Sequence, residues 1–147
     1  VANYDDKEVT IADIPGLVEG AHKGNGLGIQ FLKHIERCKS LLHMIDITNK
    51  DLKKSYKQIK NELKNYSSKI SKKKELVVLN KTDLINIDDV KKIIKDFSKH
   101  TKSEVITLTT LEKESISKIK AKLISYASKK IKNYCDKNRI ISISRQR

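Results

Sequence analysis

Short apolar segments alternate with longer, lysine-rich amphipathic segments along this 147-residue chain, and this alternation restricts its fold more than any other feature. The apolar segments have the length and the β-branched content of buried strands, whereas the others repeat apolar residues every three or four positions, as helices do. The expected strands are 8–12, 40–47, 75–79 and 104–108, and the expected helices are 27–37, 51–69, 88–99 and 115–134. Strands that alternate with helices pair in parallel. The sequence therefore predicts an α/β domain with a mostly parallel sheet.

The composition excludes several classes of protein. Hydrophobic residues make up 37% of the chain, enough to bury one core, so wholesale disorder is excluded. Cys38 and Cys135 lie far apart and have no metal-ligand spacing, which argues against a disulfide framework and a zinc site. Since no apolar run approaches the roughly 18 residues of a membrane span, we expect a cytoplasmic protein without one.

All five glycines and the one proline lie between positions 15 and 28. Glycine is needed where the backbone takes a positive φ or approaches a ligand closely. Any unusual backbone of this protein is therefore expected in that segment.

Polar motifs follow three of the four expected strands, at the edge where parallel sheets bind ligands. The first strand is followed by Asp13-Ile14-Pro15-Gly16, the third by Asn80-Lys81-Thr82-Asp83, and the fourth by Thr109-Thr110-Leu111. The second strand is followed by Asp46-Ile47-Thr48-Asn49, which we interpret as a plain strand-to-helix turn. The sequence thus predicts a binding site composed of the three polar motifs.

The motif around Asp83 has the chemistry to select a guanine base. A carboxylate can accept two hydrogen bonds side by side, from N1–H and N2–H₂ of guanine, and adenine offers no such pair of donors. Asn80 can brace the loop and reach the acceptor edge of the base, and the Lys81 stem can lie on the base plane. The sequence therefore predicts a guanine nucleotide as ligand.

The motif around Asp13 suits the phosphate end of the same ligand. The Asp13 carboxylate can hold a Mg²⁺-bound water, because Mg²⁺ prefers oxygen ligands and keeps several waters. Gly16 lets a backbone N–H approach a terminal phosphate without interference from a side chain. Each motif alone also fits a simple turn or a helix cap. Their conjunction in this order, at two strand ends, is the pairing that guanine-nucleotide GTPases use.

The segment 13–46, with the sequence DIPGLVEGAHKGNGLGIQFLKHIERCKSLLHMID, resembles the Obg family of bacterial GTPases. The family signature reads DIPGL-(I/V)-EGA, then GxGLGxxFLxHIER, then LLHxxD. The resemblance implies a three-layer, P-loop-NTPase-like G domain that binds GTP or GDP with Mg²⁺ and hydrolyses GTP. It implies nucleotide contacts from the Asp13 and Asn80 motifs and from the loop formed by Thr109, Thr110 and Leu111. Ribosomal RNA or the large ribosomal subunit are the implied partners of a monomeric protein.

The chain departs from the family pattern at the phosphate site. It contains no GxxxxGK[ST], which family members carry upstream of the DIPG strand together with switch I. We therefore expect a G domain whose N-terminal part is missing, over 1–135, followed by a basic tail, 136–147. The expected sheet has four parallel strands and an open central position. Whether 139–147 is a short strand or a disordered end stays open, and no catalytic group can be named.

The net charge of +14 is compatible with a nucleic-acid partner. Lysine accounts for 28 of the 32 basic residues, and ten lysines lie between positions 50 and 74. That pattern equally suits an AT-rich coding bias on solvated helix faces. The alternative function is accordingly a truncated, non-hydrolysing basic module that binds RNA or the ribosome.

Overall fold

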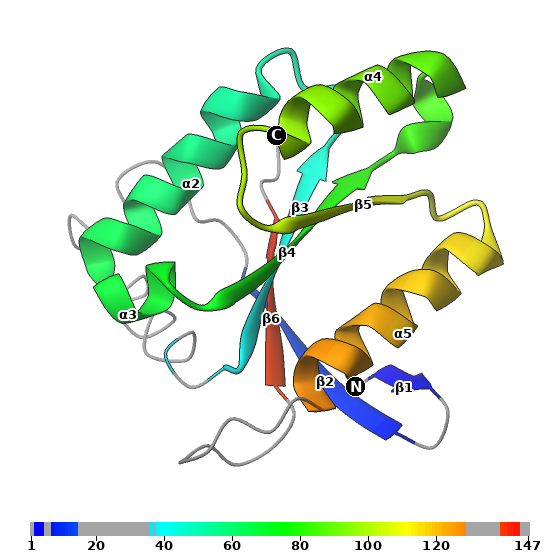
Figure 1. The fold of residues 1–147 in the computed structure, drawn as a ribbon. Helices are drawn as coiled ribbons and strands as arrows, with labels where there is room; N and C mark the ends of the chain where they lie inside the picture. Colours follow the sequence, from blue (N-terminus) through cyan, green and yellow to red (C-terminus); the bar gives the residue numbers. More distant parts are fainter. Residues whose placement is uncertain (1, 5–6, 15–35, 37, 129–138, 145–147) are drawn as a thin grey trace.

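The protein forms a six-stranded sheet with helices on both faces (Figure 1). The computed structural model describes residues 2–4, 7–14, 36, 38–128 and 139–144. Two expected features, the glycine-containing segment 15–28 and the helix 27–37, lie outside these residues except for Glu36. In the described part of the chain, no helix is long and apolar enough to span a membrane.

The sheet is parallel except at one edge, which confirms the predicted α/β class. Its strand order is β1-β2-β6-β3-β4-β5, and only β1 runs antiparallel to its neighbour. The strands are β1 (Ala2–Tyr4), β2 (Lys7–Ile14), β3 (Ser40–Asp46), β4 (Lys74–Asn80), β5 (Glu104–Leu108) and β6 (Arg139–Ser144). β3 and β4 are buried almost throughout, as expected of apolar strands covered by helices on both faces.

Side-chain caps begin two of the described helices, one at Asp51 and one at Asn86. The described helices longer than a single turn are α2 (Leu52–Tyr66), α4 (Ile87–Ser98) and α5 (Lys113–Ser128), and a short helix α3 (Ser68–Ser71) follows α2. The Asn86 carboxamide caps α4, because its oxygen accepts the Asp88 N–H at 3.0 Å. The predicted helix 51–69 is interrupted at Ser67, whose φ of −156° and ψ of 123° are extended.

Two apolar clusters cover the two faces of the sheet (Figure 1). On one face, Ile119 and Leu123 of α5 pack with Leu76 and Val78 of β4. On the other face, α2 and α4 pack on β3 and β4 through the cluster Ile45, Ile47, Tyr56, Val77, Leu79, Val90 and Phe97.

The central position of the sheet is occupied, so the expectation of a four-stranded sheet with an open centre is wrong. β6 lies parallel to both β2 and β3, with Ser142 opposite Asp13 and Ile143 opposite His43. The sequence did not decide whether 139–147 is a short strand or a disordered end. Residues 139–144 of it form a strand. Residues 136–138 and 145–147 of the expected tail lie outside the described part.

Candidate functional site

Three neighbouring strands end in register at the carboxyl edge of the sheet. Asp46 of β3 lies opposite Asn80 of β4, and Asn80 lies opposite Leu108 of β5. The residues that follow Asn80 and Leu108 are those of the predicted guanine motif and base loop. The fold therefore brings these two motifs to adjacent positions on one edge.

The loop after β4 has a tight, left-handed turn at Lys81. Lys81 has a φ of 63° and is a non-glycine residue with positive φ in the described chain. A 3-10 turn, Thr82–Leu84, follows it, and the Thr82 hydroxyl donates to the Leu108 carbonyl at 3.3 Å. Non-glycine residues in this region cost on the order of 1–3 kcal/mol and occur preferentially where a loop serves a binding site. The turn redirects the chain so that Asp83 faces the neighbouring loop.

Asp83 and Thr109 are in direct contact. The Thr109 hydroxyl donates to Oδ1 of Asp83 at 2.7 Å and accepts the Leu111 N–H at 3.3 Å. Thr109 is itself buried, and its N–H donates to the Ser115 hydroxyl at 3.1 Å. These bonds connect the predicted guanine motif to the predicted base loop. Ser115 is a supporting residue that the sequence interpretation did not identify, since a serine at a helix start carries no specific signal.

Asn80 has a buried side-chain oxygen without a partner among the described residues. Its Oδ1 accepts no hydrogen bond from that part of the chain, although the atom is removed from solvent. An unpaired buried acceptor costs about 1–3 kcal/mol, so such a group needs a reason. The atom belongs to the residue predicted to brace the base-binding loop. What this buried oxygen lacks is a hydrogen-bond donor, which a residue that braces a loop would find in the backbone of the protein.

Asp46 holds Lys81 by an ion pair, and the interpretation of its turn as plain was wrong. The Lys81 Nζ lies 2.6 Å from Oδ2 of Asp46. Oδ1 of Asp46 accepts the Thr48 N–H at 2.9 Å and the Thr48 hydroxyl at 2.7 Å. Burial raises the pKa of the Asp46 carboxyl, but the bonds from Lys81 and Thr48 outweigh it and lower the pKa to about 2. The pair fixes the end of the Lys81 side chain. The position of Asp46 directly at a strand end could have indicated this role.

The Asp13 motif lies at the end of β2, farther back along the sheet. Asp13 of β2 and Leu42 of β3 both lie opposite the same residue of β6, Ser142. Asp13 is therefore level with a position four residues before Asp46 on β3. At about 3.3 Å per residue, the two positions differ by about 13 Å along the strands. The side chains of Asp13 and Ile14 and all of Pro15 and Gly16 lie outside the described residues. In the described part, no group of three or more His, Cys, Asp or Glu residues could hold a metal ion.

The remaining residues of the base loop are exposed. Thr110 is exposed, and Leu111 is 78% exposed. Leu84, next to Asp83, is also a large apolar side chain with 62% exposure. The edge thus combines polar groups with uncovered apolar surface, as expected where a flat aromatic ligand is to be held.

A parallel sheet between two helical layers, with these two motifs at its carboxyl edge, defines the chain as part of a GTPase-class α/β domain. The family model described as "50S ribosome-binding GTPase" matches residues 1–81. The chain belongs to this family, and its curated relatives include Obg GTPases.

The similar proteins share the name GTPase Obg. The chain is 68% identical to that of Pelagibacter ubique over 128 residues, which are 87% of this chain and 39% of the relative. It is 42% identical to that of Rickettsia felis over 133 residues, 90% of this chain and 39% of the relative. For Ehrlichia ruminantium the identity is 42% over 139 residues, 95% of this chain and 39% of the relative. The chain therefore spans about two fifths of the length of these relatives.

Proposed function

We propose that this chain supplies the guanine-recognition part of an Obg-type GTPase that binds GTP and GDP and acts in ribosome assembly. The observation that carries the proposal is the contact at the carboxyl edge between Asp83 of the guanine motif and Thr109 of the base loop. Membership of a GTPase family and the Obg relatives support the same ligand.

The proposed recognition follows from the hydrogen bonds of Asp83. A carboxylate has about four acceptor positions, and Thr109 uses one of them on Oδ1. The bond holds the carboxylate in one orientation and leaves acceptor capacity for N1–H and N2–H₂ of guanine. The Thr109 N–H and the Leu111 N–H already donate to Ser115 and to the Thr109 hydroxyl, so the Thr110 N–H is the backbone donor that would face the O6 acceptor of the base. Lys81, held at its end by Asp46, would present its aliphatic stem to the ring.

The phosphate end of the nucleotide would lie toward β2. The base and the terminal phosphate of a nucleoside triphosphate are at opposite ends of an extended molecule, which suits motifs set about 13 Å apart along the strands. Asp13 is the residue proposed to hold a water of the Mg²⁺ ion, which would neutralise phosphate charge when bound. Gly16 is proposed to offer its backbone N–H to the terminal phosphate.

The substitution Asp83→Asn tests the proposed base recognition. The Asn side chain would place an NH₂ donor where guanine N1–H and N2–H₂ need two acceptors. The free energy of GDP binding to the full-length protein should therefore become about 2–4 kcal/mol less favourable. Discrimination between GDP and ADP should fall with it. Titration calorimetry with both nucleotides measures the change.

Asp88→Asn is the matched control, because Asp88 is an exposed carboxylate at the start of α4, outside the proposed site. It should bind GDP as the wild type does. Equal GDP binding by wild type and Asp83→Asn would show that Asp83 does not recognise the base.

The proposed role in ribosome assembly is tested separately. The family description names the 50S ribosome as what its members bind. We expect the full-length protein to sediment with purified 50S particles in the presence of a non-hydrolysable GTP analogue and to do so less with GDP. Sedimentation that is independent of the nucleotide would contradict a switch of this kind.

A further inference from the structure

Two of the five lysines of α2 pair with acids of other elements, Lys53 with Asp96 of α4 and Lys60 with Glu75 of β4. The other three have no acidic side chain within ion-pair distance in the described part of the chain. On α4, Lys91 pairs with Asp88 and Lys92 with Asp89, each at 3.3 Å. On α5, Lys118 pairs with Glu114 at 2.8 Å, and Lys122 pairs with Glu104 of β5. The single acidic residue within α2, Glu62, is buried and cannot neutralise its outer face.

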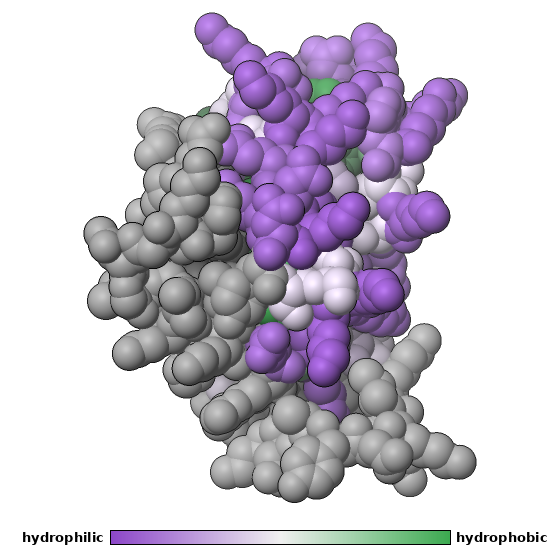
Figure 2. Space-filling view, turned by 90° about the vertical axis from the view of Figure 1, so that its left-hand side faces the viewer, coloured by the Kyte–Doolittle hydropathy of each residue, from purple (hydrophilic) through white to green (hydrophobic). Residues whose placement is uncertain are grey.

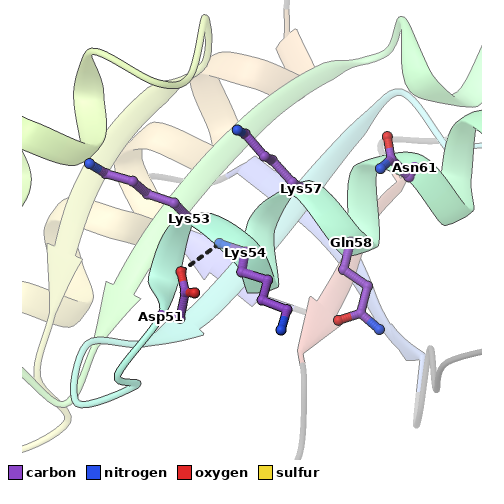
Figure 3. A pocket seen from close by; sticks show the side chains of 6 residues that line it. All are labelled: Asp51, Lys53, Lys54, Lys57, Gln58 and Asn61. Atoms are coloured by element: carbon purple, nitrogen blue, oxygen red, sulfur yellow. Dashed lines mark hydrogen bonds between the residues drawn. The ribbon is translucent and has the colours of Figure 1, made fainter.

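The unneutralised charge lies around a shallow hollow on the outer face of α2. The hollow has a volume of about 590 Å³ and is lined by Asp51, Lys53, Lys54, Lys57, Gln58 and Asn61. Lys53 and Lys57 extend to one side of the helix, and Lys54 and Gln58 extend to the other (Figure 3). We call these six residues the α2 basic surface. Figure 2 shows the side of the molecule that carries α2, where hydrophilic side chains cover most of the described part.

Two lysines of this surface are free for a ligand. Lys53 lies 2.7 Å from Asp96 of α4 and is already paired. Lys54 and Lys57 are exposed, and neither has an acidic side chain within ion-pair distance in the described part of the chain. They are three residues apart, so their Cβ atoms lie about 5–6 Å from each other on the helix surface, and from there their side chains extend to opposite sides of the helix (Figure 3). The Asp51 carboxylate caps the helix through the Lys54 N–H at 3.0 Å, so an anion would bind the ammonium groups rather than the helix end.

The composition of the surface favours a nucleic acid over an acidic protein. Protein interfaces depend on buried aromatic, Met or Arg anchors, and the lining of the hollow contains none. Binding to a phosphodiester backbone needs only cations and polar donors, such as lysine and the amides of Gln58 and Asn61. Single-stranded bases would need an aromatic platform, which these residues do not provide. A duplex backbone is therefore the ligand that fits.

We propose that the α2 basic surface binds the phosphodiester backbone of a nucleic-acid duplex without reading its sequence. The choice of RNA over DNA rests on the proposed function in ribosome assembly. None of the six residues belongs to the motifs assigned to the nucleotide, so the two sites can be tested independently.

The test compares two double variants of the full-length protein with the same change in charge. Lys54→Gln with Lys57→Gln removes the two free lysines, and Lys91→Gln with Lys118→Gln removes two that are paired with acids on their own helices. Binding to a 20-base-pair RNA duplex and to a DNA duplex of the same sequence is measured between about 50 and 200 mM salt. The first variant should bind at least roughly tenfold more weakly at low salt, with a salt slope smaller by about two. The second should match the wild type.

Each other outcome overturns the proposal. Equal losses in both variants would mean that affinity follows net charge, and no loss in either would place binding elsewhere. Binding of neither duplex by the wild type, or displacement of the duplex by polyglutamate at equal charge, would exclude the nucleic-acid ligand. Preference for DNA would overturn the choice of RNA. GDP binding is measured on the same variants. If the Lys54→Gln with Lys57→Gln variant binds both GDP and the duplex as the wild type does, the α2 basic surface is not the duplex site, and the proposed function is unaffected.

Discussion

Glu75 is the most highly connected carboxylate in the described structure. It lies at the start of β4 with a side chain only 1% exposed. It accepts hydrogen bonds from Ser103 at 2.8 Å, Tyr56 at 3.0 Å and Lys60 at 3.1 Å, and it lies 3.2 Å from Nδ1 of His43. A buried charge is tolerated when it is paired and hydrogen-bonded in this way. The cluster fastens α2 to the sheet at the edge opposite the candidate site.

Glu75 should make the stability of the protein depend on acid. Burial raises the pKa of its carboxyl, but the His43 ring, the Lys60 ammonium and the Ser103 hydroxyl together lower the pKa from 4.5 to about 2. A carboxyl whose pKa is lower in the folded than in the unfolded state stabilises the folded protein at any pH above the unfolded-state pKa. This contribution disappears as pH falls from about 4.5 to about 2. The loss should be on the order of 3 kcal/mol. Urea unfolding of the full-length protein, followed by circular dichroism between pH 2 and 7, measures it.

Two substitutions separate Glu75 from the other carboxylates. Glu75→Gln should be less stable at pH 7 and should lose less stability on acidification. Glu114→Gln, in an exposed ion pair on α5, should retain the wild-type acid dependence. The same acid dependence in wild type and Glu75→Gln would assign the effect to other groups.

At the scale of elements, β6 is the strand on which the connectivity of the sheet depends. Ile141 lies opposite Ala12 of β2 and Leu41 of β3, so its backbone is enclosed by neighbours on both sides. Proline removes an N–H and is tolerated on edge strands but not in the centre of a sheet. Ile141→Pro should therefore cost about 3 kcal/mol or more, whereas Ile141→Val keeps the N–H and should change stability little. Thermal unfolding of both variants tests this, and wild-type stability of Ile141→Pro would contradict a central position for β6.

The elements that could be predicted are those whose signals are local. Segment 104–108 reads as a strand from its own residues and has the same bounds as β5. The break of the predicted helix at Ser67 could not be predicted, because Tyr66, Ser67 and Ser68 do not differ in propensity enough to mark it. The position of β6 could not be predicted either, since a short strand with three isoleucines has the same pattern at an edge as in the centre. Its partners on β2 and β3 lie a hundred residues or more away in sequence.

In the candidate site, too, the residues with a local sequence signal could be predicted, and the contacts that depend on strand pairing could not. Asp83 and Asn80 were found from a motif whose residue types are dictated by the chemistry of guanine. The contact of Asp83 with Thr109 was not predictable, because it depends on the register of β4 with β5. Lys81 was expected near the base, but its ion pair with Asp46 requires two strand ends to be side by side.

For the whole molecule, we expect the 147-residue chain to hydrolyse GTP no faster than buffer. It contains no GxxxxGK[ST], whose backbone N–H groups and lysine hold and neutralise the phosphates in enzymes of this class. Phosphate release is measured under multiple-turnover conditions, with Asp13→Ala as the matched variant. Turnover by the wild type that Asp13→Ala abolishes would contradict the prediction.

The place of β6 between β2 and β3 also sets the order in which the molecule can assemble during synthesis. Without residues 139–144, the sheet consists of two unconnected parts, β1–β2 and β3–β4–β5, each with an unpaired edge. A nascent chain exposes both edges until β6 leaves the ribosome, and exposed edges favour pairing with other chains. The contacts of β6 with β2 span most of the chain, so forming them requires closure of a long loop and slows folding. Ribosomes that stall before residue 139 should therefore release chains that aggregate, however complete the remaining strands are.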